Sequence, residues 1–368
     1  MEVLGWASGL CRRTWGVWRW RYVEEMASIR SADRPLLAAR LVAQRLSGTP
    51  AVDVVDATRH LLAVQGQDPR AARLALRARM AGGHASAVDH ALTNERSLII
   101  TSVNRGTLHL IAAEDEPLLH ALTTPQLLSN SDRRLRQEGV SAAAASRGIT
   151  AIVKALGDDG PMTRAQLRVV LEKAGVPTAR QAMVHVLFRA TLDGLILRGP
   201  MIGREHAFVL VTDWLGERPK IDRDRALAEL ARRYLAAHGP AQDRDLAKWA
   251  QLPLRDARAG LATIASELDY RADGLVDLPR NDLVALPPPR LLGPFDPLLS
   301  QKARLGSCGR SLAHVQWGDR IRGNAVAPLP AVGAMVVAER SCAVAGARPR
   351  SVASTARRLL IRQWSQGI

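Results

Sequence analysis

The chain is poor in aromatic residues and contains no long apolar run. Only 4% of its 368 residues are Phe, Trp or Tyr, whereas 47% are hydrophobic. This balance is typical of a folded, largely helical protein rather than a disordered one. Because no stretch of about eighteen apolar residues exists, we expect no transmembrane helix and no membrane partner. The length is enough for about two to four small domains.

Cysteine and the common catalytic motifs are also scarce. Cys11, Cys308 and Cys342 have neither metal-ligand spacing nor even pairing, so we expect no disulfide bond and no zinc site. The nine histidines form no HExxH pair, and phosphate-binding glycine loops and a Gly-x-Ser-x-Gly turn are missing. We therefore expect no metal and no cofactor, and the thiols fit a reducing cytoplasm.

The net charge of +16 permits DNA binding but is concentrated at the C-terminal end. Residues 301–368 hold eleven Lys or Arg against two acidic residues, and residues 1–33 hold five against four, which leaves +6 for residues 34–300. Of the 51 basic residues, 46 are Arg, a skew that GC-rich coding also produces. The charge alone does not establish a nucleic-acid partner.

Residues 34–146 begin with helical patterns and end with strands. Pro35 suits a first helical turn, Asp53 opens a second helical stretch, and further helices are expected from residue 74 and over residues 84–92. The segment 97–111 is rich in β-branched residues around a glycine, which predicts a pair of strands. Helices followed by two strands are typical of a winged-helix unit.

Residues 147–218 show the clearest pattern. A helix over 149–156 ends at a Gly-Pro turn, Thr163 is expected to cap the next helix, and Thr178 the one after it. A two-stranded wing is expected within 195–211. This order is that of a winged helix-turn-helix.

A similar order recurs in residues 219–286, with another Gly-Pro turn, which favours tandem modules. The predicted fold is mainly α, of the α+β class: tandem winged helix-turn-helix modules followed by a small C-terminal segment that is β-rich or incomplete. The expected domains are a poorly ordered extension (1–33), a first winged-helix-like module (34–146), a second (147–218), a third (219–286), and a linker with a degenerate β-rich or disordered tail (287–368).

Four short blocks resemble a known family. They are LAVQGQDPRAARLALRAR at 62–79, NRGTLHLI at 104–111, GPMTRAQL at 160–167 and LLGPFDPLL at 291–299. Together they resemble the winged-helix DNA-binding family that includes the AlkZ- and YcaQ-type bacterial DNA glycosylases. The resemblance covers residues 34–300 and is not recognisable beyond them.

The resemblance makes Gln65 and Gln67 the counterparts of the family's Gln-x-Gln motif, in which both glutamines serve base excision. An N-alkylated purine is already cationic and needs no proton to leave, so an amide that orients water and faces the sugar can suffice. We expect the pair at the end of a helix, with Gly66 letting the backbone approach DNA closely. The alternative is a polar helix end without a catalytic role.

Further candidates for DNA contact lie in two modules. Arg105, Thr107 and His109 share one face if their segment is a strand, and they either contact phosphate or sugar or form a buried polar network. The presumed recognition helix of the second module has a polar face formed by Gln181, His185 and Arg189. The candidates in the wing of this module are Arg198 and Arg204. Each set either contacts DNA or is a solvated face.

We therefore expect a DNA-repair glycosylase that hydrolyses the N-glycosidic bond of bulky or crosslinked N-alkylated purines in double-stranded DNA. We expect a monomer without an obligate protein partner. A non-catalytic winged-helix DNA-binding protein or transcriptional regulator is the alternative.

Overall fold

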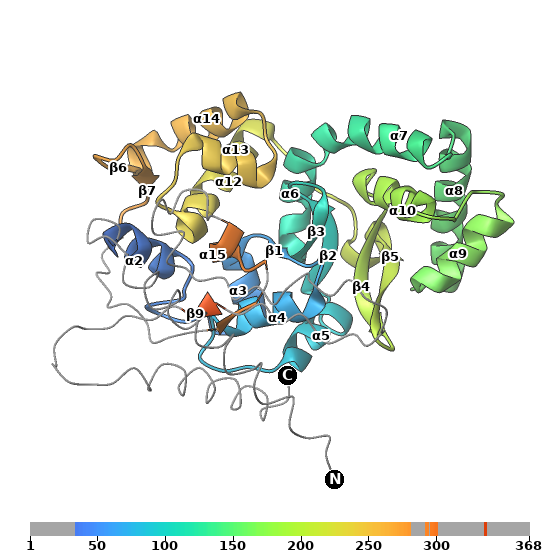
Figure 1. Ribbon diagram of the computed structural model, residues 1–368, viewed down its shortest axis with the longest axis horizontal. Helices are drawn as coiled ribbons and strands as arrows, with labels where there is room; N and C mark the ends of the chain where they lie inside the picture. The colour runs from blue at the N-terminus through green and yellow to red at the C-terminus, as the bar shows by residue number, and fades with distance from the viewer. Residues whose placement is uncertain (1–33, 281–290, 294, 301–334, 337–368) are drawn as a thin grey trace, which may run out of the picture.

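The computed structural model describes residues 34–280, 291–293, 295–300 and 335–336. The predicted extension at 1–33, the three cysteines and most of the predicted tail lie outside these residues. Within them, three successive segments share one order of elements: a helix, a short extended segment, two helices and a hairpin. We call them the first, second and third units. Figure 1 shows the first unit between the other two, with the second on its right and the third on its left.

The first unit contains the Gln-x-Gln segment, which lies between two of its helices. Its elements are α3 (Val54–Leu61), β1 (Val64–Gln65), α4 (Pro69–Arg77), α5 (Ala85–Thr93), β2 (Leu98–Val103) and β3 (Thr107–Ala112), preceded by α2 (Arg34–Ala43). Asp53 caps α3 by accepting a hydrogen bond from the backbone N–H of Asp56 at 2.7 Å. Asp68 caps α4 in the same way, and Pro69 occupies the first helical turn, where its missing N–H is not needed.

Two helices connect the first unit to the second. They are α6 (Glu116–Thr123) and α7 (Leu128–Gln137). The second unit comprises α8 (Ala142–Asp159), α9 (Arg164–Lys173), α10 (Ala182–Leu192), β4 (Ile196–Ile202) and β5 (Glu205–Leu210). Thr163 forms the expected cap, as part of a capping box with Gln166.

Two details of the second unit differ from the prediction. Helix α8 begins at Ala142, seven residues before the predicted start at 149, because Ser141 caps an alanine run that has no clear apolar period. Thr178 does not cap α10, which begins at Ala182. Its hydroxyl instead donates to the carboxylate of Glu172 at 2.9 Å.

The third unit lies against the first unit. It comprises α12 (Arg223–His238), α13 (Asp243–Ala250), α14 (Leu254–Thr263), β6 (Asp269–Tyr270) and β7 (Val276–Asp277), and it follows the short helix α11 (Val211–Leu215). Arg233 of α12 donates to the buried carboxylate of Asp115, directly before α6, and to the carbonyl oxygen of Arg59 in α3 of the first unit. These bonds fix α12 against α3.

The first and second units share one sheet, which the sequence patterns do not indicate. Its order is β1-β3-β2-β4-β5, with every neighbour antiparallel. The two hairpins meet where Ile100 of β2 pairs with Arg198 of β4. The same hairpin of the second unit also touches α5, since the backbone N–H of Met201 donates to the hydroxyl of Thr93 at 3.1 Å. The two units are therefore joined by one continuous sheet and by a contact between the second hairpin and α5.

The extended segment of each unit pairs with the last strand of its hairpin. In the first unit Val64 pairs with Leu110, in the second Met162 bridges Phe208, and in the third a bridge joins Ala241 to Val276. This repeated pairing confirms the α+β winged-helix architecture that the sequence predicts.

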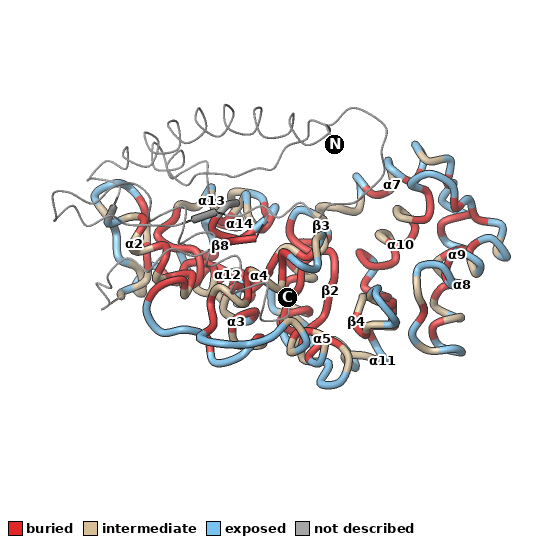
Figure 2. The backbone as a smooth tube through the Cα atoms, turned by 60° about the horizontal axis from the view of Figure 1, so that its bottom comes forward, coloured by how far each residue is buried: buried red, intermediate tan, exposed pale blue. Residues whose placement is uncertain are grey.

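Apolar side chains form continuous packing between the units. One buried cluster joins Leu62 and Ile99 of the first unit, together with Leu119 of α6, to Leu227 and Tyr234 of α12. Figure 2 shows the buried backbone continuing through α12, α4 and β2, with exposed residues concentrated in loops and outer turns. No helix in the described part of the chain is long and apolar enough to cross a membrane.

The block at 291–300 closes the fold over the first unit. It forms β8 (Leu291–Leu292) and α15 (Pro297–Ser300), and β8 pairs with β9 (Met335–Val336). The guanidinium of Arg79 donates to both oxygens of Asp296, at 2.8 and 2.9 Å, and both side chains are buried. The predicted linker around residues 287–289 lies outside the described residues.

Candidate functional site

The Gln-x-Gln segment lies on a strand edge rather than at the end of a helix. Helix α3 ends at Leu61, and Gln65 belongs to β1, where it pairs with His109 of β3. Gln67 follows two residues later, directly before the residue that caps α4. The prediction of a helix end is wrong here, because a strand of two residues depends on its pairing with β3 and has no pattern of its own.

The two glutamines point toward one another. The Gln65 amide nitrogen donates to the Gln67 amide oxygen at 2.5 Å. Gln65 is half-buried and Gln67 is exposed, so the pair can be reached from outside the protein. Because residues i and i+2 of an extended segment share a face, the pair lies on the same face as His109 and Thr107.

Gly66 permits a close approach to β3 rather than to DNA. Its backbone N–H donates to the carbonyl of Leu108 at 2.7 Å. A Cβ atom at this position would lie 3.2 Å from the backbone nitrogen of Leu110. Gly66 is itself buried, so the expectation that it brings the backbone close to DNA is wrong. Because Gly66 has no side chain, β1 packs closely against β3, and this packing fixes the backbone of both glutamines.

His109 is part of a buried polar contact. Its Nδ1 donates to the carbonyl of Thr107 at 2.8 Å, and burial lowers its pKa to about 4. The imidazole is therefore neutral at pH 7 and carries no proton on its other nitrogen. His109 is buried and Thr107 is half-buried beside it, whereas Arg105 is exposed, so the three predicted residues differ in their access to DNA.

Two exposed arginines lie close to the glutamines. Arg105 occupies the turn between β2 and β3, and its positive charge helps to lower the pKa of His109. Arg70 lies in the first turn of α4, three residues after Gln67. Arg70 was not among the sequence candidates, although its place directly after the motif could have indicated it. Exposed guanidinium groups beside a site suit phosphate contacts.

Comparison with known proteins identifies the family. A sequence model of the family described as DNA glycosylase AlkZ-like matches residues 58–365. The chain belongs to the AlkZ-like DNA glycosylase family. The match continues past residue 300, so the expectation that the likeness ends there is wrong, and most of the C-terminal segment is part of the family's domain.

A solved structure supports this assignment. DNA glycosylase AlkZ of Streptomyces sahachiroi is similar to this chain with a TM-score of 0.60 and 25% identity, over 74% of this chain and 77% of that one. No curated protein matches the chain. The chain is therefore a DNA glycosylase with DNA as its substrate, and the family supports an enzyme rather than the non-catalytic regulator.

In this glycosylase the predicted recognition helix of the second unit is covered. Helix α7 packs along α10, and Arg189 forms ion pairs with Asp132 of α7 and with Asp193. The backbone N–H of Gln181 donates to the carboxylate of Glu138 at 3.3 Å, and burial lowers the pKa of the half-buried His185. DNA contact by Arg189 would require its ion pairs to break, whereas Gln181 is exposed.

The two wing arginines differ in their surroundings. Arg198 is half-buried, with its guanidinium 4.8 Å from the ring centre of Phe208, and burial lowers its pKa. Arg204 lies at the exposed turn between β4 and β5. Only Arg204 is placed where a phosphate could reach it without rearrangement.

Acidic residues near the first unit are used for structure. Asp115 is buried and bound to Arg233, and Glu116 is buried and bound to Arg218. Among the described residues no cluster of His, Cys, Asp and Glu could hold a metal ion. The glutamine site is therefore built from uncharged polar side chains with arginines beside it.

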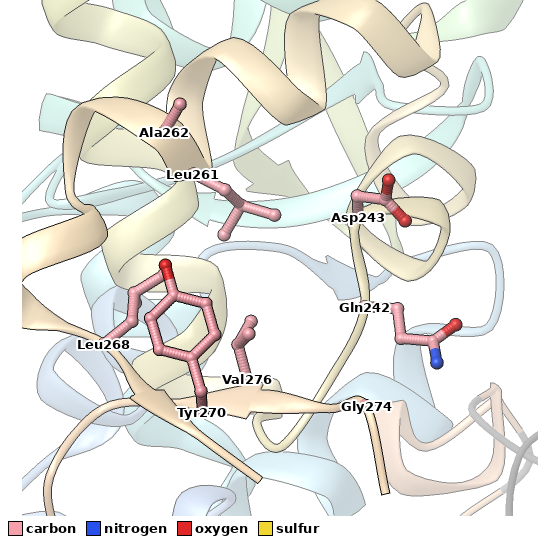
Figure 3. Close-up of a pocket in the computed structure, with 8 residues that line it drawn as sticks. All are labelled: Gln242, Asp243, Leu261, Ala262, Leu268, Tyr270, Gly274 and Val276. Carbon is pink, nitrogen blue, oxygen red and sulfur yellow. The ribbon is translucent and has the colours of Figure 1, made fainter. Parts of the chain in front are cut away.

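The third unit has a shallow hollow of about 300 Å³ between its last two helices and its wing. Figure 3 shows Tyr270 and Leu268 facing Leu261, with Gln242 and Asp243 on the opposite side. The hollow lies in a different unit from the glutamines, and its lining holds no nucleophile paired with a base. It is not the candidate active site.

Proposed function

We propose that this glycosylase hydrolyses the N-glycosidic bond of bulky N-alkylated purines in double-stranded DNA, crosslinked purines included, with Gln65 and Gln67 at the reaction centre. The observation that supports this most strongly is the 2.5 Å contact between the two amides at an accessible strand edge. His109 and Thr107, which share their face, are uncharged at pH 7.

An uncharged site restricts the substrate. Breaking an ordinary purine–sugar bond requires a proton on the leaving base. His109 is neutral at pH 7 and has no imidazolium proton to donate. A purine alkylated at N7 or N3 already carries a positive charge and leaves as a neutral base. Such a base needs only stabilisation of the positive charge that develops on the sugar and a correctly placed water molecule.

The hydrogen bond between the amides gives them complementary roles. Gln65 donates to the Gln67 oxygen, which fixes the direction of both amide dipoles. The oxygen of Gln67 has a second lone pair that can accept from the attacking water, because an amide oxygen accepts two hydrogen bonds. The dipoles face the sugar, where positive charge develops, and Arg70 and Arg105 bind the flanking phosphates.

The test is base release from a duplex that carries one N7-alkylguanine, with abasic sites detected by strand cleavage in alkali. We expect Gln65→Ala and Gln67→Ala each to lower the single-turnover rate about 100-fold, the usual effect of removing one preorganised polar group. Gln137→Ala, on the exposed surface of α7, is the matched control and should leave the rate unchanged. Full activity in the Gln65→Ala, Gln67→Ala double variant would refute the proposed reaction centre.

Two finer features belong to the same proposal. A single chain contains both glutamines and both flanking arginines, so we expect the monomer to be the active form. Activity that stays proportional to enzyme concentration down to the nanomolar range, with a monomeric mass by light scattering, supports this. Release of one arm of an interstrand N7-guanine crosslink tests the crosslinked substrate.

A further inference from the structure

Phe295 is a large apolar side chain held in the open. Its exposed fraction is 50%, in a chain that has only three phenylalanines. Its backbone has a φ of +63°, in the left-handed region that a bulky residue rarely adopts. Exposure of a ring and a left-handed backbone are both unfavourable, and residues kept in such conformations are concentrated at functional sites.

The residues around Phe295 hold its backbone firmly. Asp296 is fully buried and accepts two hydrogen bonds from Arg79 and one from the backbone N–H of Leu298, at 3.0 Å. Leu292 and Leu298 are buried on either side. The backbone is therefore anchored by buried residues on both sides of Phe295, which is itself exposed.

This base rests on the helix that follows the glutamine pair. A Cβ atom on Gly293 would lie 3.1 Å from the carbonyl oxygen of Ala71 and 3.2 Å from its Cα, in the first half of α4. Ala71 is four residues after Gln67, and Gly293 is two before Phe295. Six residues of chain and one van der Waals contact therefore separate Phe295 from Gln67, which keeps their Cα atoms within roughly 25 Å of one another. Figure 1 shows α15, which follows Phe295, in the same central region as β1 and α4.

We propose that Phe295 inserts into the DNA base stack beside the lesion and stabilises the duplex with the damaged nucleotide extruded. A base must leave the stack before its sugar bond can reach a protein side chain, and this opens a gap between its neighbours. Apolar side chains inserted between base steps fill such gaps. An exposed phenylalanine on an anchored backbone matches this requirement, since little ordering of the backbone is needed on binding. The inference rests on the proposed glutamine centre.

The test compares one N7-alkylguanine in a duplex with the same lesion in a single-stranded oligonucleotide, where no neighbouring pair has to be opened. We expect Phe295→Ala to lower the single-turnover rate on the duplex at least tenfold and to change the single-strand rate less than twofold. Phe295→Leu, which keeps an apolar wedge, should restore most of the duplex rate. Val52→Ala, at a side chain that is 82% exposed in the first unit, should change neither rate.

Two further measurements separate insertion from a structural role. With 2-aminopurine beside the lesion, the fluorescence gain on binding should be smaller for Phe295→Ala than for the unaltered enzyme. Phe295→Gly should keep or raise the melting temperature, because glycine adopts a positive φ freely. Equal losses on duplex and single strand, an unchanged duplex rate, or a lower melting temperature for Phe295→Gly would each overturn the proposal. Gln67→Ala should lower the rate on both the duplex and the single strand. If it does not, the proposed glutamine centre is wrong, and this outcome is distinct from a failure of the Phe295 proposal.

Discussion

Replacement of Asp296 with alanine is expected to detach the 291–298 segment from the first unit. Arg79 and Asp296 have side-chain exposures of 1% and 0%, and they are joined by two short hydrogen bonds. Removing one partner of a buried pair leaves the other charge without compensation, which destabilises by roughly 3–5 kcal/mol. Arg79 keeps Gln44 and the carbonyl of Ala75 as acceptors, so we expect the lower end, about 3 kcal/mol.

The assay is urea unfolding of the full chain, followed by circular dichroism, together with limited proteolysis. A loss of about 3 kcal/mol is a large part of the roughly 5–15 kcal/mol of a typical protein. If the segment detaches before the units unfold, the loss is instead seen as faster cleavage between β8 and α15. The Arg79→Met, Asp296→Leu double variant removes both charges and should recover most of the stability. An Asp296→Ala protein with an unchanged midpoint and unchanged proteolysis would refute the reasoning.

Three other predictions concern the glutamine site and its surroundings. Burial lowers the pKa of His109 to about 4 and that of His238 to about 3, so the unfolded chain binds more protons below about pH 6.5. The free energy of unfolding should be highest above that pH and should fall toward pH 4 by roughly 1.4 kcal/mol per pH unit for each histidine. Urea unfolding at a series of pH values measures this, and a stability that does not change with pH contradicts it. Gly66→Ala should push β1 from β3 and lower base release at least tenfold with unchanged DNA affinity; an unchanged rate contradicts it. Arg70→Ala and Arg105→Ala should each reduce the salt dependence of DNA affinity by about one phosphate contact, and unaltered slopes would exclude that role.

The local signals of the sequence predicted the elements that depend on neighbouring residues. Asp53 begins its helix and Thr163 caps its helix as expected, and both side chains make an N-cap bond to a residue three positions later. Thr178 has a similar local setting but bonds to Glu172 of the preceding helix instead. The Gly-Pro turns and hairpins likewise marked the repeated order of elements.

Features that depend on distant residues could not be predicted. The two-residue strand of Gln65 exists through its pairing with β3, more than forty positions away. The covering of α10 by α7 depends on an ion pair between Arg189 and Asp132. Asp296 belonged to a recognised block, but its partner Arg79 lies 217 positions away and could be found only in the folded structure.

The central claim is that the leaving base must already be cationic. It is tested most directly with two duplexes that carry the same alkyl group on guanine, at N7 in one and at O6 in the other. Only the first base is cationic. We expect rapid release of the N7 base, no release of the O6 base above the uncatalysed rate, and loss of the difference in the Gln65→Ala, Gln67→Ala double variant. Comparable release of both bases by the unaltered enzyme would contradict a mechanism that relies on two uncharged amides.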